Sequence, residues 1–181
     1  MLSKKVAVTL VVVSGAALAV FAVAGDQHCQ GKGSSAKLEV IKQLAGDWVR
    51  VGGDGRPTDQ IFSSYRVTAG GSAVLETLFC GTNHEMITVY HEDGEHLVLT
   101  HYCTLGNQPH MRAEPTDDPN RIVFKCAGVS NAKSENDEHM HEGRLTILGD
   151  DRIKTEWLKF KDGKNDYTAS FELVRKAGQR S

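Results

Sequence analysis

The stretch that decides the fold is HEMITVYHEDGEHLVLTHYC, residues 84–103. Its two halves are rich in β-branched and aromatic residues, and the Asp93-Gly94 pair between them is typical of a two-residue hairpin turn. A type I′ turn at this pair places Glu92 opposite Glu95 and makes Met86 and His101 cross-strand neighbours. We therefore predict that two antiparallel strands joined by a tight turn form the centre of this chain.

Side chains on these two strands alternate between two faces. The second face carries the charged Glu85 and the pair His91 and His96, which suits solvent better than a core. We therefore expect the first face to point inward. That face carries His84, Met86, Thr88, Tyr90, Leu97, Leu99, His101 and Cys103.

Similar short β-rich segments, separated by turn residues about every ten positions, follow from Gly46 to Arg175. The expected strands are 47–51, 59–68, 72–80, 84–92, 95–103, 108–113, 121–127, 139–148, 152–160 and 166–175. Because no helices lie between them, a parallel α/β sheet is excluded. Closing such a sheet removes its aggregation-prone edges, so we predict an all-β fold, a closed antiparallel up-and-down β-barrel of about ten strands; a β-sandwich is the alternative.

A short N-terminal helix is expected over residues 36–44, after two serines that can cap it. Leu38, Ile41 and Leu44 fall on one face of this helix. We predict that this face docks on the wall or rim of the barrel.

The first 24 residues contain two lysines, a long apolar run and the small-residue pattern Ala22-Val23-Ala24. These are the parts of a secretory signal peptide, cleaved after Ala24, although an uncleaved membrane anchor is the alternative. A polar linker over 25–34 then leads to one domain over 35–176. We expect an exported protein, periplasmic or secreted, with no stable membrane insertion after cleavage.

The segment Leu44-Ala45-Gly46-Asp47-Trp48 resembles the L-x-G-x-W signature that opens lipocalin-like (calycin) β-barrels. The closing hairpin over residues 157–175 is similar to the last hairpin of small exported bacterial proteins of that kind, whose function is unknown. The resemblance implies a cup-shaped barrel that holds one small, largely apolar molecule. A fold does not name its ligand.

We therefore predict that the chain binds a small apolar or amphipathic molecule in the barrel, oriented by a few polar groups. The residues expected to bind it are His84, Met86, Thr88, Tyr90, Leu99, His101, Asn107 and Gln108. The alternative is that the histidines among them are core residues bonded to backbone or tyrosine. Trp48 and Trp157 are interpreted as core and barrel-closing residues rather than ligand platforms.

A second hypothesis is a metal- or haem-binding protein, or an enzyme, that uses His84, Met86, His101 and Cys103. Two imidazoles and two sulfurs suit copper or haem better than magnesium or calcium. The sequence lacks metalloprotease, thioredoxin-like, c-type haem and nucleophile-elbow motifs. No sequence motif therefore supports the enzyme hypothesis, and the sequence does not identify a cofactor. A module that binds only a protein partner is a third alternative.

The net charge of −2 and the isoelectric point near 6.4 show no excess of basic residues for binding a phosphate backbone, which argues against nucleic acid as a partner. Cysteines occur at 29, 80, 103 and 126. Export would permit disulfides, and Cys80 and Cys103 are the pair best placed to form one, with a free inward thiol as the alternative.

Two further features depend on which way a side chain points. If Glu76 is buried, it needs a partner, for which a histidine or Arg66 is available. His139 and His141 share the face of the apolar residues that follow them, so they could reach the barrel mouth or could lie in a frayed strand start. The polar, charged segment 128–138 is interpreted as a mobile loop rather than a site.

Overall fold

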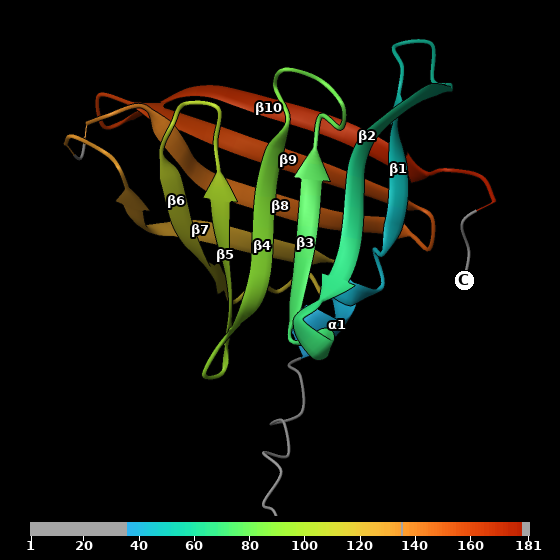
Figure 1. Cartoon of the computed structure of the whole chain (residues 1–181), viewed down its shortest axis with the longest axis horizontal. Helices are drawn as coiled ribbons and strands as arrows, with labels where there is room; N and C mark the ends of the chain where they lie inside the picture. Colours follow the sequence, from blue (N-terminus) through green and yellow to red (C-terminus); the bar gives the residue numbers. More distant parts are fainter. Residues whose placement is uncertain (1–35, 135, 179–181) are drawn as a thin grey trace, which may run out of the picture. The chain divides into compact units, whose positions relative to one another are not determined.

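The computed structural model describes residues 36–134 and 136–178, which form a closed antiparallel barrel with one short helix (Figure 1). The elements in order are α1 (Ala36–Lys42), β1 (Gly46–Val51), β2 (Pro57–Thr68), a 3-10 turn (Ala69–Gly71), β3 (Ala73–Leu78), β4 (Met86–Asp93), β5 (His96–Tyr102), β6 (Gln108–Glu114), β7 (Arg121–Ser130), β8 (His139–Gly149), β9 (Arg152–Lys161) and β10 (Lys164–Arg175). Each strand pairs with the next along the chain, and β1 pairs with β10 to close the sheet. The predicted fold class is confirmed. The expected signal peptide and linker, and Cys29, lie outside the described residues.

The inner face of the barrel is filled by the apolar residues of alternate positions, as a pleated sheet requires. Among the most deeply buried are Val74, Leu97, Leu99, Met111, Phe124, Ile153 and Leu173. On β4 and β5 the predicted inward face is largely correct. Thr88, Tyr90, Leu97, Leu99, His101 and Cys103 are buried, whereas His91 and His96 are exposed.

The register of the β4–β5 hairpin differs from the prediction by two residues. Asp93 pairs with His96, so the central residues of the turn are Gly94 and Glu95. Only Gly94, at φ +62°, has a positive φ, whereas a type I′ turn needs two such residues. The slip preserves the faces, because side chains repeat every second residue, but it places Thr88 rather than Met86 opposite His101.

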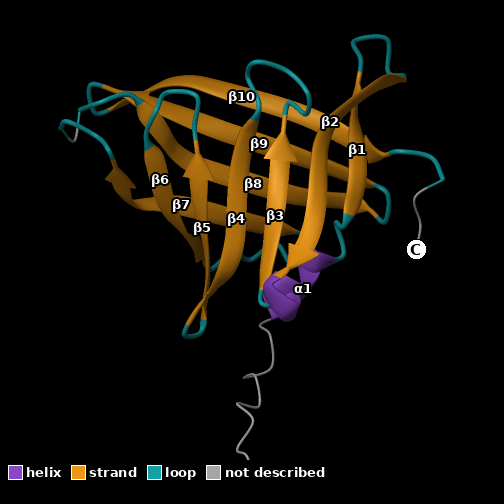
Figure 2. Cartoon of the chain, viewed as in Figure 1, coloured by secondary structure: helices purple, strands orange, loops and turns teal. Residues whose placement is uncertain are grey.

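Helix α1 covers one end of the barrel, beside the start of β3 (Figure 2). Leu38 and Ile41 are almost fully buried, and Leu44, just after the helix, belongs to the same core cluster. The predicted docking of the helix is confirmed. Among the described residues, no helix is long and apolar enough to cross a membrane.

The L-x-G-x-W segment and the last strand meet at this closed end. Trp48 is fully buried, and its indole N–H donates to the Leu44 carbonyl at 2.8 Å. The Arg175 guanidinium lies 4.5 Å from the Trp48 ring and donates to the carbonyls of Ala45 and Gln43. These contacts join the first and last strands across the barrel seam.

Cys80 and Cys103, the pair considered best placed for a disulfide, do not form one: both are free thiols, as is Cys126. Each of the two belongs to its own turn. The Cys80 thiol donates to the Thr77 carbonyl at 3.3 Å, and the Cys103 N–H donates to the Asn107 carbonyl at 3.2 Å.

Candidate functional site

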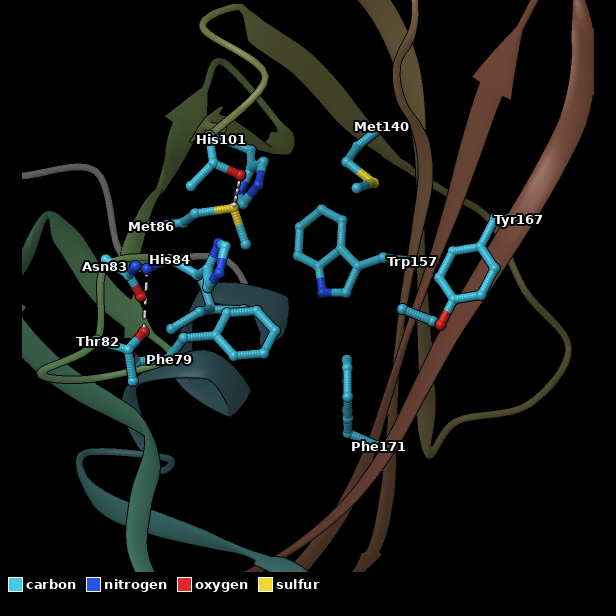
Figure 3. A pocket seen from close by; sticks show the side chains of 13 residues that line it. Phe79, Thr82, Asn83, His84, Met86, His101, Met140, Trp157, Tyr167 and Phe171 are labelled. Carbon is cyan, nitrogen blue, oxygen red and sulfur yellow. Dashed lines mark hydrogen bonds between the residues drawn. The ribbon is translucent and has the colours of Figure 1, made fainter.

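A cavity of about 560 Å³ lies at the connection between β3 and β4 (Figure 3), and Figure 1 shows this connection at the end of the barrel opposite α1. It is bounded by the connection between β3 and β4 and by strands from both sides of the barrel. Its lining residues are Leu78, Phe79, Thr82, Asn83, His84, Met86, His101, Thr104, Met140, Trp157, Tyr167, Ala169 and Phe171. This volume lies within the range of about 300–1,000 Å³ typical of small-molecule sites.

Aromatic rings build one wall of the cavity. The Phe62 ring contacts Phe79 and Phe171 at centroid distances of 4.7 and 4.6 Å. Phe79 adopts φ +53°, a left-handed conformation that is costly for a bulky residue, and its N–H donates to the Phe62 carbonyl at 2.7 Å. The fold therefore holds the Phe79 ring at the cavity despite an unfavourable backbone conformation.

His101 provides the deepest polar group of the lining. Its ring lies 4.7 Å from the Trp157 ring, and its Nδ1 is hydrogen-bonded with the Thr88 hydroxyl at 2.9 Å. Burial lowers the pKa of His101 to about 4, so the imidazole is neutral at neutral pH. Because Nε2 has no hydrogen-bond partner among the described residues, it is available to a molecule in the cavity.

Three of the eight residues predicted to bind ligand line the cavity: His84, Met86 and His101. His84 is exposed and lies in the β3–β4 connection at the mouth, where its N–H donates to the Thr82 hydroxyl at 3.1 Å. Met86 begins β4, and its sulfur accepts a hydrogen bond from Thr104.

The other five do not line it. Thr88 lies behind His101, and Tyr90 and Leu99 border a void of only about 10 Å³ deeper in the barrel. Asn107 is buried elsewhere and donates to the Glu138 carbonyl at 2.8 Å, and Gln108 bonds the Gly106 carbonyl. Both follow Thr104, which lines the cavity from the same β5–β6 connection, so this connection lies at the mouth but the side chains of Asn107 and Gln108 are not part of the lining.

Glu76 borders the same small void and is buried, with partners that differ from those predicted. Its carboxylate accepts hydrogen bonds from Ser63 at 2.9 Å and from Tyr65 and Tyr90 at 2.6 Å, rather than from a histidine or an arginine. Burial raises the pKa of Glu76, and burial next to this carboxyl raises the pKa of both tyrosines. The three hydroxyls satisfy an acid that would otherwise be costly to bury.

Sequence reasoning missed the far wall of the cavity. Tyr167, Ala169 and Phe171 recur at every second position of β10, a signal that was present in the sequence. Trp157 belongs to the buried core cluster, as interpreted from the sequence, and its ring also lines the cavity.

Of the four residues proposed as metal ligands, His84, Met86 and His101 line the cavity and Cys103 does not. His84 is at the exposed mouth, Cys103 lies outside the cavity lining, and the two-residue slip separates Met86 from its predicted position opposite His101. Among the described residues, the histidine, cysteine and acidic side chains that do converge are Cys126, His139 and His141.

A bulge in β8 changes the predicted placement of those two histidines. Met140 pairs with Lys159 and Glu142 with Leu158, so one residue is inserted between them. Met140 then lines the cavity, and His139 and His141 do not. The prediction that both share the face of Leu145 and Ile147 fails because alternation is interrupted at the bulge.

Comparison with models of protein families and with curated proteins finds no match for this chain.

Proposed function

We propose that this protein binds a small apolar or amphipathic molecule in the cavity at the open end of its barrel. One observation carries the proposal: the cavity of about 560 Å³ is lined mainly by aromatic and aliphatic side chains and methionines. Transfer of an apolar molecule from water onto such a lining stabilises the complex by about 25 cal/mol per Å² of apolar surface buried.

The polar groups suggest how the molecule would lie. Thr82, Asn83 and His84 gather at the mouth, whereas Trp157 and the neutral His101 lie deeper (Figure 3). An amphipathic molecule would place its apolar part against the aromatic wall and its polar end at the mouth. Two deep groups, Nε2 of His101 and the indole N–H of Trp157, would favour a ligand with one or two polar atoms in its buried part.

The chain's two tryptophans allow a local test with a fatty acid that carries a terminal bromine, ω-bromoundecanoic acid. Bromine quenches indole fluorescence only near contact. Trp157 lines the cavity and Trp48 is buried at the closed end. We expect saturable quenching in the Trp48→Phe protein, in which Trp157 is the emitter, and little in the Trp157→Phe protein. Unbrominated undecanoic acid should reverse the quenching.

A matched pair on β10 tests whether binding is inside the barrel. Ala169 lines the cavity, whereas its neighbour Ser170 is exposed. By calorimetry with undecanoic acid, Ala169→Phe should lower affinity at least about tenfold, which is about 1.4 kcal/mol, and Ser170→Phe should leave it unchanged. Absence of saturable quenching of Trp157, or equal effects of the two substitutions, would contradict the proposal.

A further inference from the structure

A second site lies where strands β7 and β8 separate, outside the ligand cavity. The two strands pair from Arg121 opposite Thr146 to Lys125 opposite Glu142, and no pair follows. Cys126 is the next residue on β7, and His141 is the next on β8. The end of the strand pairing therefore brings a thiol and an imidazole to the same gap.

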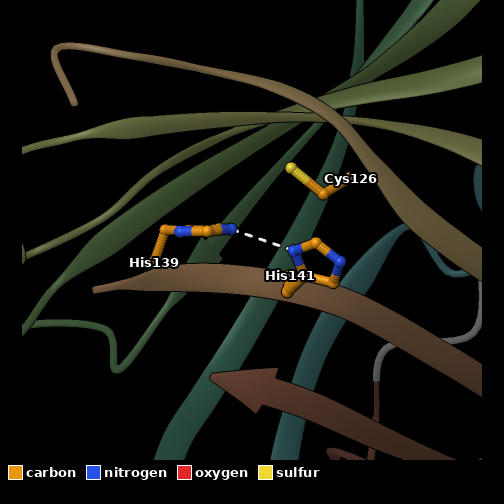
Figure 4. Close-up of side chains that lie close together, drawn as sticks. All are labelled: Cys126, His139 and His141. Atoms are coloured by element: carbon orange, nitrogen blue, oxygen red, sulfur yellow. Dashed lines mark hydrogen bonds between the residues drawn. The ribbon is translucent and has the colours of Figure 1, made fainter. Parts of the chain in front are cut away.

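The bulge in β8 adds a second imidazole to that gap. His139 and His141 lie with Nε2 of the first 2.9 Å from Nδ1 of the second. The ligand atoms of Cys126, His139 and His141 are all within 4.8 Å of one another (Figure 4). Tetrahedral zinc, with bonds of about 2.0–2.3 Å, separates its ligand atoms by roughly 3.3–3.7 Å, so only small movements would bring the three around one ion.

Both rings are already held in place. Nδ1 of His139 lies 2.7 Å from the Asp137 carbonyl and donates to it, so the lone pair of Nε2 accepts the hydrogen bond from Nδ1–H of His141. A metal ion in the gap would replace this hydrogen bond, and the Nδ1 proton of His141 would move through solvent to Nε2 of the same ring. His139 is buried, and the His141 ring stacks on Phe160 at a centroid distance of 3.8 Å and an angle of 14°. A backbone carbonyl that fixes the tautomer of a ligating histidine is a recurrent feature of metal sites.

The geometry points to a binding site for a borderline-soft transition-metal ion such as Zn²⁺, with Cys126, His139 and His141 as its three protein ligands. One thiolate and two imidazoles suit such an ion and not magnesium or calcium. The Cys126 thiol now donates to the Gly128 carbonyl at 3.5 Å, and it would lose its proton to solvent when the metal–sulfur bond forms.

The fourth coordination position would face open space. A pocket of about 610 Å³ is lined by the three residues together with Ser134, Asn136 and other residues of the β7–β8 connection. Three protein ligands with an open position are typical of sites at which a metal binds water or a small molecule. The segment 128–138, interpreted from sequence as a mobile loop rather than a site, thus supplies part of the wall of this pocket.

The test uses the full chain, reduced and free of metal, titrated with Co²⁺ and then with Zn²⁺. Cobalt bound by a thiolate gives a sulfur-to-metal charge-transfer band in the near ultraviolet and visible bands of a four-coordinate ion. We expect both in the wild-type protein at one ion per chain, with displacement by Zn²⁺. Failure to bind at micromolar metal would overturn the proposal.

Matched variants identify the ligands. Cys126→Ser should abolish the charge-transfer band, whereas Cys103→Ser, which removes another thiol, should retain it. His141→Ala should weaken Zn²⁺ binding by more than about 100-fold, because loss of second-shell partners alone costs about 10- to 100-fold. His110→Ala, which removes a histidine bonded to Thr100 and Ser130, should leave binding unchanged.

Circular dichroism before metal addition shows whether each variant is folded. If Cys126→Ser or His141→Ala is folded and binds Zn²⁺ as tightly as the wild type, the assignment is wrong. Fatty-acid quenching of Trp157 reports separately on the barrel cavity, so failure of either proposal can be recognised without the other.

Discussion

At the scale of single residues, His101 connects the polar part of the cavity to the stability of the fold. Its imidazole is buried, lies at a tilt beside the Trp157 ring and is bonded to Thr88, and its pKa is lowered to about 4. The unfolded chain has the ordinary histidine pKa of about 6.5, so the unfolded state takes up a proton first as pH falls. The stability contributed by neutral His101 is therefore complete above about pH 6.5 and is lost between that pH and about 4.

We expect this loss to approach about 1.4 kcal/mol for each pH unit within that window. It can be measured by urea unfolding of the wild type and of His101→Gln, which cannot titrate. From pH 7 to pH 4 the free energy of unfolding of the wild type should fall by about 2–3 kcal/mol relative to the variant. His141, whose pKa burial also lowers, is present in both proteins and cancels. A difference independent of pH would show that His101 is not held neutral by its surroundings.

At the scale of elements, the helix is stabilised by packing rather than by its own length. Seven residues are too few for an independent helix, and α1 depends on the burial of Leu38 and Ile41. Replacing both with alanine should lower the free energy of unfolding by several kcal/mol, since each large-to-small change in a core costs about 2–5 kcal/mol. The exposed Gln43→Ala is the control and should have little effect in urea denaturation. An unchanged unfolding midpoint in the double variant would mean that the helix does not contribute to the core.

The elements also show what the sequence could and could not predict. Period-two hydrophobicity and turn residues located all ten strands and the inward face of β4 and β5, because burial acts on every second residue. They could not locate the β4–β5 turn, since Asp93-Gly94 and Gly94-Glu95 both provide a glycine, and both registers bury the same face. Nor could they locate the bulge at His141, because an inserted residue has no signal in the pattern of apolar residues. The predicted contacts of the site residues were the least accurate, because a two-residue shift in register keeps each side chain on its face but changes its cross-strand neighbour.

At the scale of the whole molecule, the barrel has a closed end filled by packed side chains and an open end that holds the cavity. α1, Trp48 and Arg175 fill the closed end, where the first and last strands meet. The cavity, with Trp157 and His101, occupies the open end. Substitutions at the two ends should therefore separate stability from binding, because sites without shared contacts act almost additively.

Arg175 is the residue that tests this separation. Its guanidinium stacks on Trp48 at 4.5 Å, donates to two carbonyls at 2.6 and 2.9 Å, and pairs with Asp151 at 3.1 Å. Lysine keeps the charge but has no planar group with which to stack and donate in several directions, so Arg175→Lys should lower the free energy of unfolding by about 2–4 kcal/mol. The affinity of the folded variant for undecanoic acid should stay within about twofold of the wild type. Ala169→Phe should show the reverse, a loss of affinity at least about tenfold with a smaller loss of stability. If Arg175→Lys weakens binding as strongly as Ala169→Phe does, the two ends of the barrel are coupled and the cavity depends on closure of the seam.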